Sequence, residues 1–220
     1  MEPVTPQYLL EGALYALEQC GVLLHDAVAL YRSEAYASAT VLAAFAREEL
    51  GRAQILFDFR KQTVKERKRV TLKGVKSKCD DHITKQKWAQ LSMTLRLSGQ
   101  ERAAQQLAKA ANPEERTRII AELRDIMQQK AKRLPQDRHE QRISALYVEP
   151  NESGTGWNRP RERTRDAARE FIEDAIGDYA TEHDRYVGGM MIQYDDSELF
   201  QALQNWSGCP ELPRYEWPEP

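Results

Sequence analysis

The sequence has little of what marks several large classes of protein. Glycine (11) and proline (10) are sparse among the 220 residues, and the prolines fall mostly late, a composition that favours helices. No run of 18 apolar residues occurs and Met1-Glu2-Pro3 carries no basic residue, so we expect neither a membrane span nor a signal peptide. Cys20, Cys79 and Cys209 are far apart and form no Cys-x-x-Cys pair, which predicts free thiols and a cytosolic protein.

The motifs of common metal and cofactor sites are also missing. Paired glutamates in helical bundles often hold two irons, but such sites need Glu-x-x-His on two helices. The chain has one Glu-Glu pair in mid-helix and no repeated Glu-x-x-His spacing. It contains no phosphate-binding glycine loop, nucleophile elbow or zinc-ligand spacing. We therefore expect no metal and no cofactor.

The chain is rich in helical periodicity. Thr5 and Pro6 are a cap and a first-turn residue, and apolar residues then recur at steps of three and four as far as Val28. Ser33 is the expected cap of a second helix, whose small residues Ala35, Ala39, Ala43, Ala46 and Ala53 form one face. Small faces let helix backbones approach closely, so the sequence predicts an antiparallel hairpin and an all-α fold.

Later signals predict a bundle with a C-terminal extension. We expect a frayed basic segment over 61–76, helices over about 81–97, 100–111 and from Asn112-Pro113 onward, and an interruption at Pro135 before 138–146. A loop over 151–156, a long helix over 161–186, a short helix near 197–206 and a proline-rich tail follow. The expected organisation is a helical bundle over 1–150 and a loop, an amphipathic helix and an acidic extension over 151–220.

Charge is unevenly distributed along the chain. Residues 60–87 contain eleven Lys or Arg against three Asp or Glu, whereas residues 170–220 contain twelve acidic residues against two arginines. The basic segment could dock on the acidic one or bind phosphates, with Lys76 and Lys78 among the candidates. A segment of this charge density is compatible with RNA, and a solvated helix face and loop is the plain alternative.

The most unusual motif lies inside the second predicted helix. Residues 46–53 bring Glu48, Glu49, Arg52 and Gly51 into an otherwise apolar pattern. Charges on such a helix are costly to bury unless they are paired. Arg52 lies one helical turn from both glutamates and could form an ion pair with either of them. The motif therefore predicts an internal ion pair, a partner surface or a site.

Three segments in order resemble one family. Tyr36-x-x-Ala39, Ala43-x-x-Ala46-x-Glu48-Glu49-Leu50-Gly51-Arg52-Ala53 resembles the second helix of AbiV-type abortive infection proteins of the HEPN superfamily. Asp81-His82-Ile83-Thr84-Lys85 resembles that family's His-x-x-Lys element. Arg142-Ile143-Ser144-Ala145-Leu146-Tyr147-Val148, with Trp157 and Pro160 after it, resembles its Arg-x-x-x-Leu-Tyr-Val segment and the following loop. The resemblance covers about residues 8–160.

The resemblance implies an all-α HEPN-like bundle with a role in defence against phage. Many HEPN proteins are metal-independent ribonucleases with an Arg-x4–6-His motif at a pocket of a symmetric dimer, so a homodimer is implied. Arg133 and His139 have this spacing, but Pro135 is expected to break the helix between them. Arg142-x4-Tyr147 places a tyrosine where histidine would stand, and tyrosine is a poor proton shuttle near neutral pH.

Two hypotheses follow from these residues. In the first, the protein is an RNA-targeting toxin. Its predicted catalytic residues are His82, Arg142, Tyr147, Glu48 and Glu49, and its predicted phosphate-binding residues are Arg52, Lys85, Lys76 and Lys78. In the second, an inactive bundle binds RNA or a phage or host protein through its basic segment, and Glu48 and Glu49 form a buried ion-pair network with Arg52 and Arg142 that fixes the helix register. The distance between His82 and Arg142 distinguishes the two hypotheses.

Overall fold

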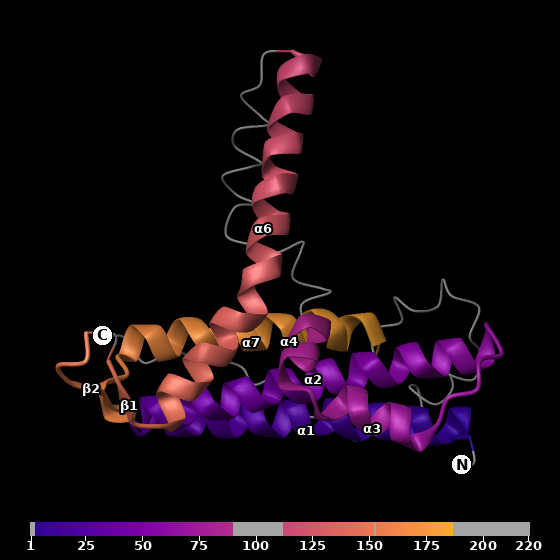
Figure 1. The fold of residues 1–220 in the computed structure, drawn as a ribbon, viewed down its shortest axis with the longest axis horizontal. Helices are drawn as coiled ribbons and strands as arrows, with labels where there is room; N and C mark the ends of the chain where they lie inside the picture. Colours follow the sequence, from indigo (N-terminus) through magenta and orange to yellow (C-terminus); the bar gives the residue numbers. More distant parts are fainter. Residues whose placement is uncertain (1–2, 90–111, 152, 187–220) are drawn as a thin grey trace.

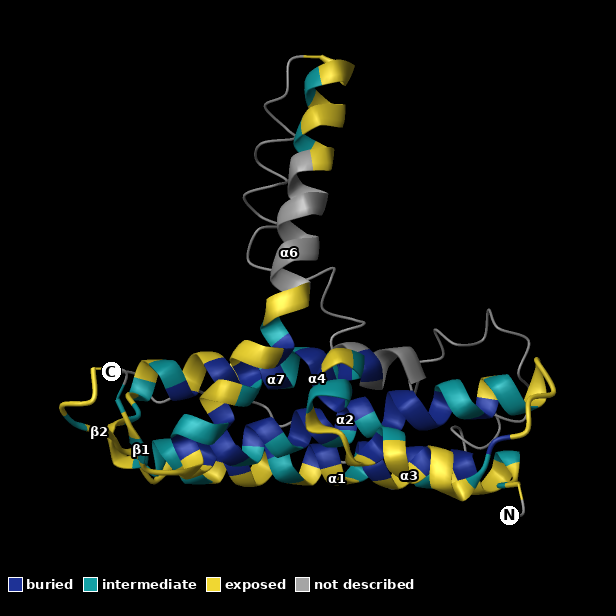
Figure 2. Cartoon of the chain, viewed as in Figure 1, coloured by how far each residue is buried: buried dark blue, intermediate teal, exposed yellow. Residues whose placement is uncertain are grey.

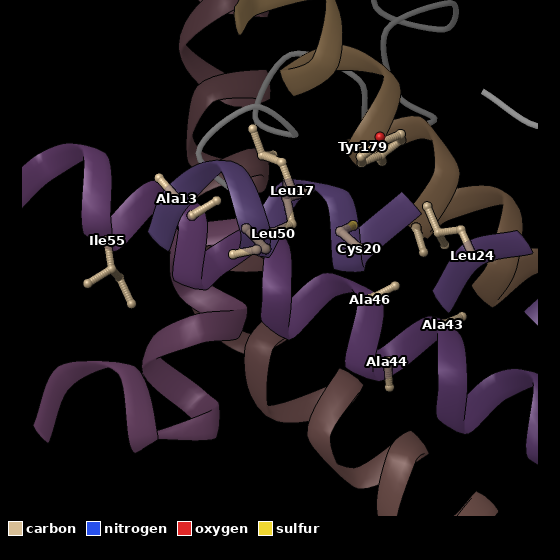
Figure 3. Packing of buried hydrophobic residues seen from close by; sticks show 14 of the residues in the cluster. Ala13, Leu17, Cys20, Leu24, Ala43, Ala44, Ala46, Leu50, Ile55 and Tyr179 are labelled. Atoms are coloured by element: carbon tan, nitrogen blue, oxygen red, sulfur yellow. The ribbon is translucent and has the colours of Figure 1, made fainter. Parts of the chain in front are cut away.

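Two long antiparallel helices, α1 (Pro6–Arg32) and α2 (Tyr36–Val64), form the base of the fold (Figure 1). The structure is a computed structural model that describes residues 3–89, 112–151 and 153–186. The predicted hairpin is confirmed. Ala39, Ala43, Ala46 and Ala53 are fully buried, and Figure 3 shows Ala43, Ala46 and Leu50 of α2 among Leu17, Cys20 and Leu24 of α1. The small side chains bring the two backbones close together.

The ends of these helices follow their local sequence, with one exception. Thr5 caps α1 as predicted, because its Oγ1 accepts a hydrogen bond from the backbone N–H of Tyr8 at 3.1 Å. Ser33 does not cap α2. Its hydroxyl donates to the carbonyl of Leu30 at 2.9 Å at the end of α1, and Glu34 takes a left-handed conformation (φ 63°) before α2 starts. The tight turn therefore uses Ser33 to close one helix rather than to open the next.

Among the described helices, α1 alone is long and apolar enough to cross a membrane by length and composition. Half of its most apolar 18-residue window is buried inside the fold. Its apolar residues, including Leu9, Leu17 and Leu24, pack in the core that α2 and α7 (Arg165–Tyr186) complete. A core helix of a globular protein passes the same test, so this finding alone assigns no membrane role.

The basic segment is more ordered than the sequence predicted. α2 continues to Val64, and α3 (Leu72–Asp80) occupies part of the expected loop. Thr71 caps α3 by accepting from the backbone N–H of Gly74 at 3.3 Å, while Val75 and Cys79, one turn apart, bury the same face. These two buried positions are too few for the periodicity to stand out among lysines. α4 (His82–Ala89) follows directly.

The long helix α6 (Pro113–Leu146) begins as predicted but does not break at Pro135. Asn112 caps it by accepting from the backbone N–H of Glu115 at 2.8 Å, with Pro113 in the first turn. Pro135 is buried inside the continuous helix, where packing offsets the lost backbone hydrogen bond. The N-terminal half of α6 projects from the other helices, and its C-terminal part crosses them (Figures 1 and 2).

The chain after α6 returns to the bundle. The strands β1 (Glu149–Pro150) and β2 (Trp157–Asn158) form a small antiparallel hairpin around the loop predicted over 151–156. The 3-10 helix η2 (Pro160–Glu162) then precedes α7, which starts later than residue 161. The predicted helices over 100–111 and 197–206, and the tail, lie outside the described residues.

The core unites α1, α2 and α7. Phe171, Ile172, Ala175 and Tyr179 of α7 are buried with the apolar faces of α1 and α2, and Figure 3 shows Tyr179 over this cluster. Burying a leucine, isoleucine or phenylalanine side chain contributes about 1.5–3 kcal/mol. The predicted all-α class is confirmed, since the described residues form helices apart from the loops and this hairpin.

Candidate functional site

A buried carboxylate, Glu48 on α2, collects three basic side chains from two other helices. Its Oε2 lies 2.6 Å from Nδ1 of His82 and 3.3 Å from Nζ of Lys85, both on α4. Its Oε1 lies 3.6 Å from Nη1 of Arg142 on α6. The side chains of Glu48, Lys85 and Arg142 are nearly inaccessible (4%, 5% and 9%), whereas that of His82 is 46% exposed. His82 therefore sits at the mouth of a buried charged cluster, which we call the Glu48 cluster.

α4 reaches Glu48 because α2 has a glycine at the crossing. A methyl group at Gly51 would overlap the backbone carbonyl of Lys85, so only glycine lets α4 lie this close to α2. Asp81 fixes where α4 begins. Its carboxylate accepts from the backbone N–H groups of Ile83 (2.9 Å) and Thr84 (3.3 Å), which is the arrangement of a helix N-cap. His82 and Lys85 then lie one turn apart on the face toward Glu48.

α6 adds a second imidazole, that of His139, which was not among the predicted catalytic residues. Nη2 of Arg142 lies 3.4 Å from Nδ1 of His139, and the rings of His139 and His82 are 6.4 Å apart between centroids. Because arginine can only donate, Nδ1 of His139 accepts, which leaves the proton of a neutral His139 on Nε2. Partial burial, and then the charge of Arg142, lower the pKa of His139 below its usual value. Both effects favour the neutral form of the His139 imidazole.

Arg142 adds a second buried cation to the Glu48 cluster. Its guanidinium lies over the ring of Phe45 at 5.6 Å, and its buried Nε makes no hydrogen bond to the described residues. Two cations, Lys85 and Arg142, face the single carboxylate of Glu48. The cluster thus has an excess of positive charge and, among the described residues, a buried donor without an acceptor.

Glu49 and Arg52 lie beside this cluster and pair with each other. Nη2 of Arg52 is 3.4 Å from Oε1 of Glu49, so the arginine forms its ion pair with Glu49 and not with Glu48. Burial raises the pKa of Glu49, and the charges of Arg52 and Lys85 oppose that rise. Glu49 and Arg52 therefore form an ion pair within one helix, which is one of the three predictions for this motif. Glu48, by contrast, has its partners on other helices.

Besides Glu49 and Arg52, the structure leaves three more of the predicted site residues outside the Glu48 cluster. Tyr147 follows the end of α6, is 53% exposed, and forms no hydrogen bond or ion pair with the cluster. Lys76 is exposed on α3. Lys78 is partly buried: its Nζ lies 3.7 Å from Asp58 and stacks over the rings of Trp88 (4.7 Å) and Phe59 (5.0 Å). Lys78 therefore helps to fix α3 against α2 and α4. Arg133, the partner of His139 in the spacing motif, is exposed.

A second buried network, which the sequence analysis missed, adjoins the first. Arg47, the neighbour of Glu48, lies 2.5 Å from Asp174 and 3.0 Å from Asp178 of α7. Arg138, one turn before Arg142, reaches the same carboxylates at 2.9 and 3.5 Å. The one available signal was the spacing of Asp174 and Asp178, which puts two acidic residues on the apolar face of the predicted helix.

The two aspartates differ in their electrostatics. Complete burial raises the pKa of Asp178 to about 6, although Arg47 and Arg138 oppose the rise. For the partly exposed Asp174 the balance is reversed: burial would raise its pKa, but the two guanidinium groups hold it below the usual value. Burial, and then the charge of Arg47, lower the pKa of Arg138 to about 10, so it remains a cation at neutral pH.

Comparison with known proteins agrees with the resemblance in the sequence. Among the described residues, no group of three or more His, Cys, Asp or Glu is arranged to hold a metal ion. No curated protein and no solved structure matches the chain. The model of the AbiV family of HEPN proteins matches residues 8–178, a span that includes both charged networks. This match covers most of the chain, and the protein therefore belongs to the AbiV family of HEPN proteins.

Proposed function

We propose that the protein is an antiphage effector that acts on RNA, and that the Glu48 cluster is its phosphodiester-cleaving site. The observation that carries the proposal is the convergence of His82, Lys85 and Arg142, from two helices, on one buried carboxylate. A purely structural network would not need an exposed imidazole at its mouth. Proton transfer by imidazole and charge stabilisation by guanidinium are what cleavage of RNA without a metal requires.

The contacts suggest a role for each side chain. Glu48 accepts the Nδ1 proton of His82, which orients the ring and leaves Nε2 able to take a proton. His82 would remove the proton from a ribose 2′-hydroxyl. The 2′-oxygen would then form a bond to phosphorus while the bond from phosphorus to the 5′-oxygen breaks. The same imidazolium would return its proton to the leaving 5′-oxygen, giving a 2′,3′-cyclic phosphate and a 5′-hydroxyl.

Lys85 and Arg142 would stabilise the negative charge that builds on the phosphoryl oxygens. The neutral form of His139 offers its Nε2–H as a further donor beside Arg142. In this scheme Glu48 orients His82 and does not touch the substrate. Tyr147, Lys76 and Lys78 have no part in the chemical step.

Cleavage of labelled single-stranded RNA by the purified chain tests this proposal. His82→Ala and Arg142→Ala should abolish cleavage, and in cells they should abolish protection during phage challenge. Two matched controls should keep both activities: His25→Ala, an exposed histidine on α1, and Arg133→Ala, an exposed arginine on α6. Full cleavage by His82→Ala and Arg142→Ala would reject this site.

The alternative is an inactive bundle that binds RNA or a phage or host protein. The observation that favours it is the exposed basic stretch over 65–69, between α2 and α3, which could bind a polyanion without chemistry. Protection that persists in both His82→Ala and Arg142→Ala, without RNA cleavage, would favour this alternative. Loss of protection on neutralising the basic stretch would then identify the binding surface.

A further inference from the structure

The second buried network shares α2 and α6 with the Glu48 cluster, but it joins them to α7 and not to α4. Arg47 and Glu48 are consecutive on α2, and Arg138 and Arg142 are one turn apart on α6. Arg138 meets Asp174 and Asp178, whereas Arg142 meets Glu48. The helix that carries His139 is therefore held by carboxylates on both sides of that residue.

The contact of α6 with the bundle is narrow and depends on charge. The N-terminal half of α6 projects from the other helices, so the helix meets them through its C-terminal part (Figure 2). The buried positions there are Pro135, Arg138, Arg142 and Ala145, which recur at steps of three and four and form one stripe. Two of these four residues are arginines. Leu134 and Ile143 are only partly buried, so the described residues of this part of α6 bury few apolar side chains against the bundle.

We propose that Arg138, gripped by Asp174 and Asp178 of α7, is a positioning residue that sets His139 and Arg142 in the Glu48 cluster. For its catalytic consequence this inference rests on the proposed function, but the positioning itself does not. In this proposal Arg138 acts through its ion pairs with Asp174 and Asp178, which fix the placement of α6.

The geometry explains why an ion pair is used at this point. Buried ion pairs add little net stability compared with apolar residues of the same size, because both charges must be desolvated. They do impose direction, since a planar guanidinium bonds two carboxylates only in a restricted set of orientations. Arg138 is 1% exposed, and Arg47 shares both carboxylates with it. The two arginines and two aspartates balance in charge. Their ion pairs join α2, α6 and α7.

A second anchor of α6 lies at the surface. Arg163 donates to the side chain of Gln141 at 3.0 Å, and Gln141 is exposed. A solvated hydrogen bond from a guanidinium to a neutral amide contributes less than a buried hydrogen bond between two charged groups. The buried ion pairs of Arg138 therefore limit the position of His139 more than this surface contact does, together with the ion pair between Arg142 and Glu48.

His139 reports on this position without any substrate. The charged and titratable groups that face it are Arg142 and Glu140 on α6, His82 on α4 and Glu48 on α2. Its pKa lies below 6.5 because of partial burial and the charge of Arg142. A displacement of α6 that exposes the ring relieves its desolvation and raises this pKa, whereas Arg142 moves with His139 because both lie on α6. Removing an acidic charge elsewhere acts in the opposite direction, because it makes protonation less favourable.

The test is the titration of His139 in the full chain by NMR, in wild type, Asp174→Asn and the control Glu173→Gln. Asp174 is partly exposed and bridges Arg47 and Arg138. Its substitution by asparagine therefore weakens these ion pairs without creating a cavity in the core. Glu173 is an exposed carboxylate on the same helix that pairs only with Arg169 among the described ion pairs. We expect the pKa of His139 to rise toward 6.5 in Asp174→Asn and to stay unchanged in Glu173→Gln.

The outcomes separate positioning from general stability and from the proposed function. A folded Asp174→Asn protein whose His139 pKa is unchanged or lower overturns the inference. If Asp174→Asn does not fold, Arg138→Lys, which keeps the charge but loses the planar fork, should show the same rise; an unfolded Arg138→Lys also overturns it. If wild type cleaves RNA, kcat/KM should fall by roughly 10- to 100-fold in Asp174→Asn. If wild type does not cleave RNA, the proposed function fails and the titration still decides the positioning.

Discussion

Oε2 of Glu48 and Nδ1 of His82 lie 2.6 Å apart, although 34 residues separate them in the chain. The contact joins the double-glutamate motif of α2 to the first residue of α4. It fixes which nitrogen of His82 faces the interior and which faces the mouth of the cluster. The predictions below test this contact and the elements that make it.

Replacing Glu48 should destabilise the fold as well as the site. Glu48→Gln keeps the size of the side chain but leaves Lys85 and Arg142 buried without their shared counter-charge. Breaking a buried ion pair in this way costs about 3–5 kcal/mol. Urea unfolding measures the loss. The matched control is Glu49→Gln, whose half-exposed partner Arg52 predicts a loss of at most about 1 kcal/mol. Equal losses in both variants would contradict the assigned geometry.

A methyl group at Gly51 should push α4 away from α2. The added Cβ of Gly51→Ala overlaps the backbone of Lys85, which cannot rotate aside as a side chain can. We expect a loss of about 1–3 kcal/mol in unfolding free energy, together with loss of RNA cleavage. Gly74→Ala is the control, since its Cβ would meet only Thr71 Oγ1 at 3.5 Å. There, alanine should stabilise α3 by about 0.5–1 kcal/mol. An unchanged stability of Gly51→Ala would mean that α4 does not cross at this glycine.

Asp81 should make part of the stability depend on acid pH. Hydrogen bonds from the Thr84 side chain, and from the N–H groups of Thr84 and Ile83, lower the pKa of Asp81 below 3.8. A lowered folded-state pKa contributes stability above the unfolded value, and this contribution disappears as pH falls through the folded value. Asp81→Ala should cost about 1 kcal/mol at neutral pH.

Asp81→Asn is the control for that pH dependence, because its side-chain oxygen can still cap α4 but does not titrate. The stability difference between wild type and Asp81→Asn should shrink as the pH is lowered from neutral toward 3. Thermal unfolding over that range measures it. A difference that grows toward acid would show that the carboxylate is not the capping form.

Lys76 and Lys78 should differ in RNA binding although both belong to the basic segment. Lys76 is exposed, whereas Lys78 is engaged by Asp58, Phe59 and Trp88. If the basic segment contacts phosphates, Lys76→Ala should reduce the slope of log affinity against log salt by about 1. Lys78→Ala should leave that slope unchanged and lower stability slightly. Fluorescence anisotropy with labelled RNA at several salt concentrations measures both, and an effect of Lys78 alone would reverse the assignment.

The sequence determined the local features of the fold. Thr5-Pro6 and Asn112-Pro113 start helices because a cap and a fixed φ act over one turn. The alanine face of α2 predicted the hairpin, since close packing needs only small side chains at helical spacing. The cost of burying charge predicted that the charges of the α2 motif would pair internally, meet a partner or line a site, and the family resemblance pointed to His82, Lys85 and Arg142.

Tertiary packing decided the rest. The continuity of α6 through Pro135, and with it the place of His139 beside Arg142, depends on contacts that offset a local penalty. The grip of Asp174 and Asp178 on Arg47 and Arg138 joins residues more than thirty positions apart. No local pattern records which acidic residue meets which arginine, because ion pairs have no sequence period. Their partners are set only when the helices pack and exclude water from the charges between them.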